Sequence, residues 1–396
     1  MTRELKIADR FIGDKHPTYI IAEVSCNHEG NFDEARKIIE AAAACGADAV
    51  KMQTYTADTI SRNFGTRPKG TIWESMDLHK LYSQAQTPWE WTKELMKISN
   101  DLGMHFFSSP FDETAVDFLV DAGVPVLKAA SFEIVDTKLL AHMAKTGLPV
   151  IMSNGMTDFL EMQEAVNTLR SNGTKDLAIL HCNSGYPAAF DEANLNTIPA
   201  IAALFDTVTG LSDHTLFADT ANYAQPLAHI TPVEAVKFGA RIIELHLMMD
   251  RAYARTLFDK QEGGYDWPFS REPAELKKMI DMIRHYEKTG EVNYETEAER
   301  KAAALTHGNV CFEPTPKEIN SRNVRPSLWV VEDIKKGEVF DFAALTRKGN
   351  FDSIRPAGGV HIRFTDIIDG AKATRDLKAG EPLSWDMVDM SAKKAC

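Results

Sequence analysis

The sequence has few cysteines, no excess of positive charge and no long apolar run, and each shortage excludes a class of protein. Its five cysteines are scattered and form no CxxC pair, so neither a disulfide framework nor a thiolate zinc site is expected. Lys and Arg number 44 against 57 Asp and Glu, a net charge of −13, which argues against binding nucleic acid or an anionic membrane. With no apolar leader and no run of ~18 apolar residues to span a bilayer, we expect a cytoplasmic protein.

Eight short apolar runs alternate with helix-period segments between about residues 19 and 290. The runs are Tyr19–Val24, Ala49–Met52, His105–Phe107, Pro125–Leu127, Val150–Met152, Ala178–His181, Thr207–Gly210 and Arg241–Leu245. They are apolar throughout rather than alternating, which is typical of parallel strands buried on both faces. No GxGxxG motif follows the first run, so a dinucleotide-binding sheet is disfavoured. The pattern predicts an α/β protein with a (β/α)₈ TIM barrel.

The character of the sequence changes after the eighth unit. We expect the barrel over residues 1–290 and a polar linker over 291–323. The linker is predicted to be helical over Tyr294–Leu305 and extended around Pro314 and Pro316. Residues 324–396 contain short β-type runs and similar charged turns, which indicate a second, small β-rich domain.

Polar side chains follow every predicted strand, where a TIM barrel carries its catalytic groups. They include Glu23, Lys51, Lys128 and Glu244. Two lysines in one mouth of low dielectric constant repel each other unless an anion lies between them, and hydroxyl groups around such an anion are typical of phosphate or carboxylate sites. Taken singly, each residue could be a solvated loop residue, but a polar set at all eight strand ends favours a site.

Two histidines, His214 and His246, follow the seventh and eighth predicted strands, which are neighbours in a closed barrel. Neutral imidazoles on adjacent strand ends can bind one divalent cation, with Glu23 or Asp213 nearby. The alternative is that each is a structural histidine. With only two histidine ligands, substrate or water would complete the coordination shell, which favours a Lewis-acid role over a structural zinc site.

Several of these segments resemble the sialic acid synthase family. The resemblance lies in residues 21–30, 46–54, 107–111, 128–133, 152–156, 181–187 and 210–215. Residues 327–338 and 355–359 are similar to the antifreeze-like (SAF) domain that closes these enzymes. Within the family, residues 54–60, 70–74, 81–91 and 263–270 are most similar to the pseudaminic acid synthase branch.

The resemblance implies a transferase that condenses phosphoenolpyruvate with a 2,4-diacetamido-2,4,6-trideoxyhexose, giving a nine-carbon 2-keto sugar acid and phosphate. An N-acetylneuraminate or legionaminate synthase with an N-acetylhexosamine-type acceptor is one alternative. A Schiff-base aldolase that uses Lys128 is another. A non-catalytic sugar-binding barrel is a third, which Leu245 and the inserted segments near 216–231, 251–262 and 342–352 support.

The resemblance also assigns roles to individual residues. Those implied to bind phosphoenolpyruvate are Lys51, Ser109, Lys128, Ser131, Ser153, Ser184 and Ser212. Those implied to face the sugar are Glu23, Tyr186, Asp266 and Arg355, with Arg355 supplied across a domain-swapped homodimer. His214 and His246 are implied to bind a divalent metal ion, Mn²⁺ first, with Mg²⁺ or Co²⁺ as alternatives. Glu23, Lys128 and the two histidines form the expected catalytic set.

Overall fold

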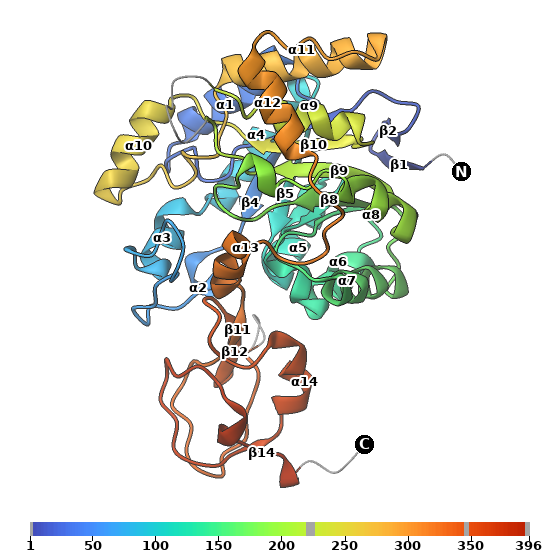
Figure 1. Cartoon of the computed structure of the whole chain (residues 1–396). Coiled ribbons are helices and arrows are strands. Elements are labelled where there is room, and N and C mark those ends of the chain that lie inside the picture. Colours follow the sequence, from blue (N-terminus) through green and yellow to red (C-terminus); the bar gives the residue numbers. More distant parts are fainter. Residues whose placement is uncertain (1–2, 219–225, 344–347, 393–396) are drawn as a thin grey trace.

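A computed structural model describes residues 3–218, 226–343 and 348–392 and shows a closed parallel barrel, which confirms the predicted (β/α)₈ fold (Figure 1). The barrel strands are β3 (Tyr19–Glu23), β4 (Ala49–Thr54), β5 (His105–Pro110), β6 (Leu127–Ala129), β7 (Val150–Ser153), β8 (Leu177–Cys182), β9 (Val208–Asp213) and β10 (Ile242–His246). They follow one another in order around the ring, and β10 closes it against β3. In that closing pair His246 lies opposite Glu23.

One predicted strand is shifted in the structure, and others extend beyond their predicted ends. The fourth was expected at Pro125–Leu127 but is β6, Leu127–Ala129, so Lys128 lies inside the strand. Pro125 has no N–H to donate to a neighbouring strand, which explains why pairing begins later. The seventh was expected to end at Gly210, yet β9 continues to Asp213. Its polar end is buried in the barrel mouth, which an apolar pattern does not detect.

Helices surround the barrel as predicted for βα units. The outer helices are α1 (Phe32–Cys45), α4 (Thr92–Asp101), α5 (Glu113–Ala122), α6 (Thr137–Lys145), α7 (Phe159–Ser171), α8 (Thr197–Phe205), α9 (Ile230–Lys237) and α11 (Pro273–Thr289). The first shows why such segments become helices. Asn31 caps α1 through its side chain, buried apolar residues recur along one face, and Gly46 ends the helix at a φ of 93°.

Two connections at the carboxyl ends of the strands are long enough to carry helices of their own. The segment after β4 contains α2 (Ala57–Ile60) and α3 (Leu78–Ala85). The segment after β10 contains α10 (Arg251–Lys260), which accounts for most of the inserted segment 251–262. The other inserted segments, 216–231 and 342–352, lie partly outside the described residues.

The opposite end of the barrel is closed by an antiparallel hairpin, β1 (Glu4–Ile7) and β2 (Arg10–Gly13). Asp9 at its turn accepts a hydrogen bond from His105, the first residue of β5. Apolar hairpin residues join the core cluster that contains barrel residues. The two ends therefore differ: one is filled by the hairpin, and the other carries long loops.

The linker contains two helices rather than one. Helix α12 (Glu297–Thr306) falls close to the predicted helix. The expectation of an extended second half is wrong, because α13 (Pro316–Ser321) begins at Pro316 with Thr315 as its N-cap. A proline at the first position of a helix is favourable, since the N–H that it lacks would be unbonded there anyway.

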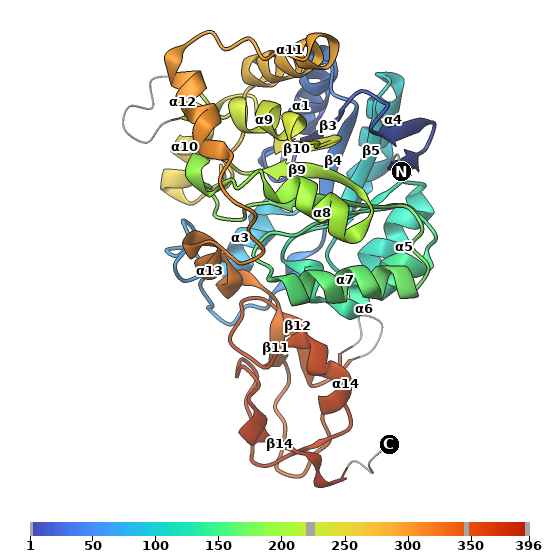
Figure 2. The same cartoon turned by 45° about the vertical axis from the view of Figure 1, so that its right-hand side comes forward.

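The C-terminal tail forms a small domain of short elements. They are β11 (Ser327–Val330), β12 (Phe351–Ile354), α14 (Thr365–Ile368), β13 (Lys372–Ala373) and β14 (Val388–Asp389). Both views place this domain at one end of the molecule, next to α13 (Figures 1 and 2), and α2 contacts its strand β12. Among the described residues, no helix is both long and apolar enough to cross a membrane.

Candidate functional site

A cavity opens at the carboxyl ends of the barrel strands. All but one of the predicted site residues line it: Glu23, Lys51, Ser109, Lys128, Ser131, Ser153, Tyr186, Ser212, His214, His246, Asp266 and Arg355. The exception is Ser184, which is fully buried behind the cavity wall. A Cβ built on Gly155 would lie 2.1 Å from the Ser184 hydroxyl oxygen, so the backbone of Gly155 covers that side chain.

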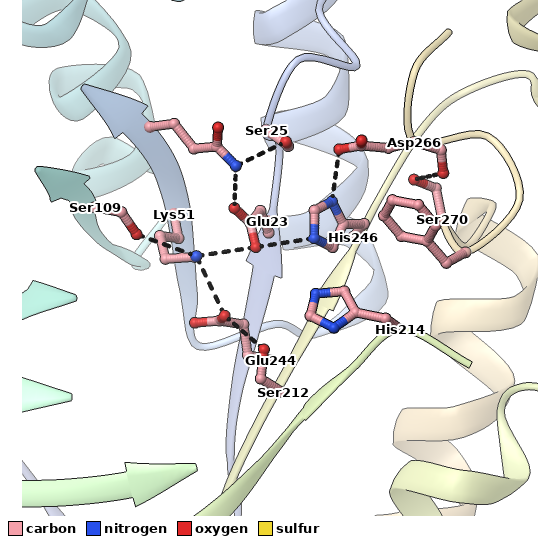
Figure 3. Close-up of polar contacts among 12 residues, drawn as sticks. Glu23, Ser25, Lys51, Ser109, Ser212, His214, Glu244, His246, Asp266 and Ser270 are labelled. Carbon is pink, nitrogen blue, oxygen red and sulfur yellow. Dashed lines mark hydrogen bonds and ion pairs between the residues drawn. The ribbon is translucent and has the colours of Figure 1, made fainter. Parts of the chain in front are cut away.

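Lys51 lies on the floor of the cavity between two carboxylates (Figure 3). Its Nζ is 2.9 Å from Glu23 Oε2 and 3.2 Å from Glu244 Oε1. It also donates to the Ser109 hydroxyl at 3.3 Å. Burial by itself lowers the pKa of Lys51, but Glu23 and Glu244 outweigh burial and raise it above its ordinary value. Lys51 is therefore a fixed ammonium.

Lys128 is buried deeper and has weaker charge partners. Its Nζ donates to the Ser153 hydroxyl at 2.7 Å and to the carbonyl of Ala129 at 2.9 Å. The nearest carboxylate oxygen, on Glu244, is 3.9 Å away. Burial lowers the pKa of Lys128, and the neighbouring Lys51 lowers it further.

Glu244 is a functional residue to which the sequence interpretation gave no role. Its Oε1 accepts a hydrogen bond from Ser212 at 3.0 Å, while its buried Oε2 has no hydrogen-bond partner. An anion was expected between the two lysines, and carboxylates of the chain itself occupy that place. Glu244 precedes His246 by two positions on β10, so strand alternation puts both on the same face. That alternation is the signal that could have identified it.

The two histidines lie side by side, with ring centroids 5.2 Å apart. His246 is flanked by carboxylates: its Nε2 is 3.2 Å from Glu23 and its Nδ1 is 2.9 Å from Asp266. Burial lowers the pKa of His246, but the two carboxylates raise it above its ordinary value overall. His214 has its Nδ1 3.2 Å from the carbonyl of Asn183, and burial holds its pKa well below the usual range.

The donor set at these histidines fits a divalent cation that substrate and water complete. His214 has its Nδ1 on a backbone carbonyl, which leaves Nε2 as the ligand atom. His246 has its Nδ1 on Asp266, so its Nε2 beside Glu23 is the nitrogen left for a cation, which would displace the proton there. Among the described residues, no cluster of three or more His, Cys, Asp or Glu side chains is arranged as a complete metal site. The alternative ligand Asp213 is not available, because it is paired with Arg271.

Arg271 is a second residue that sequence reasoning missed. It lies beyond β10 and is almost fully buried, with its guanidinium on Asp213 and on the carbonyl of Thr215. Its backbone N–H donates to the carbonyl of His246 at 2.7 Å. Arg271 therefore ties together the strand ends that carry the two histidines. No spacing rule identifies such a contact, because it joins segments far apart in the chain.

The outer part of the cavity is aromatic. Tyr186 stacks on Phe132 with centroids 5.8 Å apart and contacts Trp73 at 5.7 Å. The Trp73 indole donates to the carbonyl of Tyr265 at 3.0 Å, which joins the two long connections over the mouth. Tyr82 adds a further ring to this outer wall. The cavity thus has a charged floor and a largely apolar outer wall.

Arg355 brings the tail into the cavity. Its guanidinium donates to the Tyr82 hydroxyl at 2.7 Å, forms an ion pair with Glu133 and lies 4.6 Å from the ring centroid of Phe132. In this single chain the tail reaches its own barrel. The predicted exchange of tails between two copies is therefore not needed to bring Arg355 to the mouth, and it stays a prediction.

Comparisons with known proteins agree with this architecture. Residues 38–293 match the NeuB family and residues 325–389 match the SAF domain. Pseudaminic acid synthase of Helicobacter pylori is 33% identical, with the match covering 95% of this chain and 99% of that protein. N,N'-diacetyllegionaminic acid synthase of Legionella pneumophila is 31% identical, covering 95% and 96%. The crystal structure of the spore coat polysaccharide biosynthesis protein SpsE of Bacillus subtilis superposes with a TM-score of 0.75 at 30% identity, covering 97% and 99%.

Proposed function

This chain belongs to the NeuB family and is a phosphoenolpyruvate-dependent condensing synthase, and on that premise we propose that its acceptor is a 2,4-diacetamido-2,4,6-trideoxyhexose. The product is then a nine-carbon 2-keto acid of the pseudaminic acid type, released with phosphate. The observation that supports this proposal is a cavity whose floor holds lysines, carboxylates and serine hydroxyls and whose outer wall is aromatic.

The floor matches the charges of phosphoenolpyruvate. Lys51 and Lys128 carry ammonium groups, and the hydroxyls of Ser109, Ser131 and Ser153 lie beside them. Carboxylate and phosphate groups are bound by such sets of charged and hydroxyl donors. Ser184 is one layer further out, so in our proposal it supports the wall rather than touching the ligand.

The outer wall matches a sugar that carries methyl groups. A 6-deoxy sugar with two acetamido groups has three methyls, whereas an N-acetylhexosamine has one and more hydroxyls. The rings of Trp73, Tyr82 and Phe132 offer apolar contact, and a hydroxyl-rich sugar would lose hydrogen bonds to water there. Tyr186, Asp266 and Arg355 add polar groups around the same space.

The proposed reaction forms a bond between C3 of phosphoenolpyruvate and the sugar aldehyde carbon. Water adds at C2, the C–O bond to phosphate breaks, and the aldehyde oxygen takes a proton. A divalent cation bound by His214 and His246 would supply positive charge to that oxygen. Glu23 lies between Lys51 and His246, so it can orient the sugar or move a proton at that oxygen. Holding both reactants in register lowers the entropic barrier.

The acceptor is tested by incubating the purified chain with phosphoenolpyruvate, a divalent metal and a panel of sugars, followed by mass spectrometry. We expect phosphate release and a nine-carbon product with the 2,4-diacetamido-6-deoxy sugar. Turnover only with N-acetylmannosamine would replace the proposed acceptor. Turnover only with the legionaminate precursor, which carries the same substituents in another configuration, would keep the diacetamido-trideoxy acceptor but replace the pseudaminic acid type of product. No phosphate release with any sugar would favour a sugar-binding barrel. The choice of Mn²⁺, the homodimer and the cytoplasmic location stay predictions.

We further propose that Arg355 completes the sugar side of the site. Arg355→Ala should raise the sugar KM about tenfold or more, while the phosphoenolpyruvate KM changes little, because a charged hydrogen-bond donor is lost only on the sugar side. Equal changes in both constants would contradict this role.

Mixing Arg355→Ala chains with Lys128→Ala chains tests which barrel the tail serves. If tails are exchanged, the mixed dimer contains one intact site, formed by the unaltered barrel of one chain and the unaltered tail of the other, and activity recovers. If each tail serves its own barrel, as in this single chain, every site keeps one defect, and at a sugar concentration below the KM of Arg355→Ala the mixture shows no gain in activity.

The lowered pKa of Lys128 favours a second candidate, a Schiff-base aldolase, because a deprotonated amine is nucleophilic. Borohydride reduction in the presence of pyruvate separates the two reactions. A covalent adduct on Lys128 would support the aldolase, and phosphate release without an adduct supports the condensation.

A further inference from the structure

One linker residue reaches the predicted phosphoenolpyruvate site from outside the barrel. Glu318 lies in α13, is only 4% exposed, and its Oε1 accepts hydrogen bonds from the backbone N–H groups of Met156 and Ser184, each at 2.8 Å. Those two residues belong to the loops after β7 and β8. A single carboxylate oxygen therefore joins two neighbouring loops.

The two loops carry groups of the candidate site. Gly155, next to Met156, donates its N–H to the Ser131 hydroxyl at 3.2 Å. A Cβ at Gly155 would lie 2.1 Å from the Ser184 Oγ and 2.8 Å from the Ser131 Oγ, so the loops pack with no spare space. Moving the Met156 or Ser184 backbone therefore moves the hydroxyls on this wall.

Other side chains of the same segment hold the same loops. The Ser321 hydroxyl donates to the carbonyl of Ser184 at 2.6 Å. The guanidinium groups of Arg322 and Arg325 donate to the carbonyl of Met156 at 2.7 and 2.9 Å. The N–H and the carbonyl groups of both Met156 and Ser184 are thus bound by side chains of residues 318–325.

A second linker helix shows that this contact is more than helix capping. Helix α12 begins with the capping box of Thr296 and Glu299, as α13 begins with that of Thr315 and Glu318. The remaining oxygen of Glu299 pairs with His229 and Lys278 on the outside of the barrel. The remaining oxygen of Glu318 bonds the two loops instead, and no lysine, arginine or histidine pairs with it among the described residues.

We propose that Glu318 is a positioning residue for the phosphoenolpyruvate end of the site, and that α13 holds the loops that form that end. This inference rests on the proposed function and deepens it. Bonds from N–H groups to a carboxylate are stronger than those to a neutral acceptor, so Glu318 fixes the two loops before the ligand arrives. The ligand then loses less free energy in ordering them.

The inference is tested by titrating phosphoenolpyruvate alone into the full chain in a calorimeter. Glu318→Ala should weaken binding about tenfold or more, because two charge-assisted bonds are lost. Glu318→Gln keeps a carbonyl oxygen for both N–H groups, so it should recover most of the affinity. In turnover, Glu318→Ala should raise the phosphoenolpyruvate KM while the sugar KM stays within about twofold.

The matched control is Glu299→Ala, which removes the other capping carboxylate of the linker and should leave phosphoenolpyruvate binding unchanged. Where Glu318→Ala does not fold, Ser321→Ala replaces it and should weaken binding in the same direction by a smaller factor. Unchanged binding in Glu318→Ala, or equal weakening in Glu299→Ala, would overturn the inference alone. Failure of the wild-type chain to bind phosphoenolpyruvate would instead overturn the proposed function.

Discussion

At the scale of single residues, the two lysine charges on the floor of the site are compensated by carboxylates of the chain. Lys51 and Lys128 share one floor, and Glu244 lies between them with Oε1 3.2 Å and 3.9 Å from their Nζ atoms. One oxygen of Glu244 remains without a hydrogen bond in a buried setting, which is costly. The charges of the floor are therefore balanced within the chain, and an incoming anion changes that balance.

Glu244→Gln should make the protein depend more on its anionic ligand. Without that carboxylate the two lysines are less well compensated, so the unliganded variant should melt at a lower temperature than wild type, in line with a buried pair being broken at a cost of about 3–5 kcal/mol. Phosphoenolpyruvate should then raise the melting temperature of the variant more than that of wild type. The measurement is differential scanning calorimetry with and without the ligand. Equal ligand-induced shifts in the two proteins would refute this account.

Sequence alone located most residues of the cavity but not their partners. Lys51, His214 and His246 were found because barrel strands end at the mouth, and that rule needs only the strand pattern. The pairing of Glu244 with Lys51 and that of Arg271 with Asp213 depend on distances between segments far apart in the chain. A single sequence contains no information on such distances.

At the scale of elements, the connection after β10 is held in place at Gly264. Gly264 donates its N–H to the carboxylate of Glu29 at 3.0 Å and has a φ of +63°. A Cβ there would lie 1.9 Å from the carbonyl oxygen of Ala254 in α10. Asp266, which contacts His246, follows two residues later. The close approach therefore sets where that carboxylate lies.

Gly264→Ala should impair the sugar side of the site. Both the positive φ and the clash force the connection to move, so we expect the sugar KM to rise about tenfold or more while the phosphoenolpyruvate KM changes little. Steady-state kinetics with each substrate varied in turn measures this. Gly290→Ala is the control, because Gly290 has a φ of +77° but open space around it. A loss of activity as large in Gly290→Ala would show that general strain, not the connection, is responsible.

The linker shows where reading elements from sequence fails. Pro314 and Pro316 favoured an extended segment, yet Pro316 is the first residue of α13. A proline in the interior of a helix interrupts it, whereas a proline in the first turn is favourable. Which of the two a proline predicts therefore depends on the capping residues beside it. Thr315 and Glu318 form a capping box that was present in the sequence and was not used.

At the scale of the whole molecule, barrel and tail meet at a contact that contains a buried carboxyl group. Asp352 in β12 accepts a hydrogen bond from Arg62 of the barrel at 3.0 Å. Burial raises the pKa of Asp352 to about 7, although Arg62 lowers it. The Arg355 backbone N–H also donates to the carbonyl of Ile60 at 3.0 Å. The contact between the domains therefore includes a carboxyl group that titrates near neutral pH.

Stability should fall with rising pH because of Asp352. The folded protein keeps this proton up to about pH 7, whereas the unfolded chain releases it near pH ~3.9, so unfolding releases a proton between those values. The stabilisation is complete below the lower value and is lost as the pH rises through the higher one. Asp352→Asn has no proton to lose, so its free energy of unfolding should rise relative to wild type between about pH 4 and pH 7 and stay level above that.

Denaturant titrations at several pH values measure that difference. The control is Asp333→Asn, since Asp333 is exposed and its hydrogen bonds hold its pKa below the ordinary value. Its difference from wild type should be flat over the same range. A flat difference for Asp352→Asn as well would contradict the assignment.

The contacts of α13 also decide where relatives of this enzyme could exchange parts. By chain position this helix belongs to the connection, but its residues Glu318 and Ser321, and Arg325 after it, bind loops of the barrel. A hybrid protein that takes its tail from a relative should therefore be spliced after Arg325, so that each barrel keeps the helix that fits its own loops. Splicing upstream of Thr315 would combine the barrel loops of one parent protein with helix α13 of the other. The functional boundary of the larger domain thus lies beyond its last barrel helix.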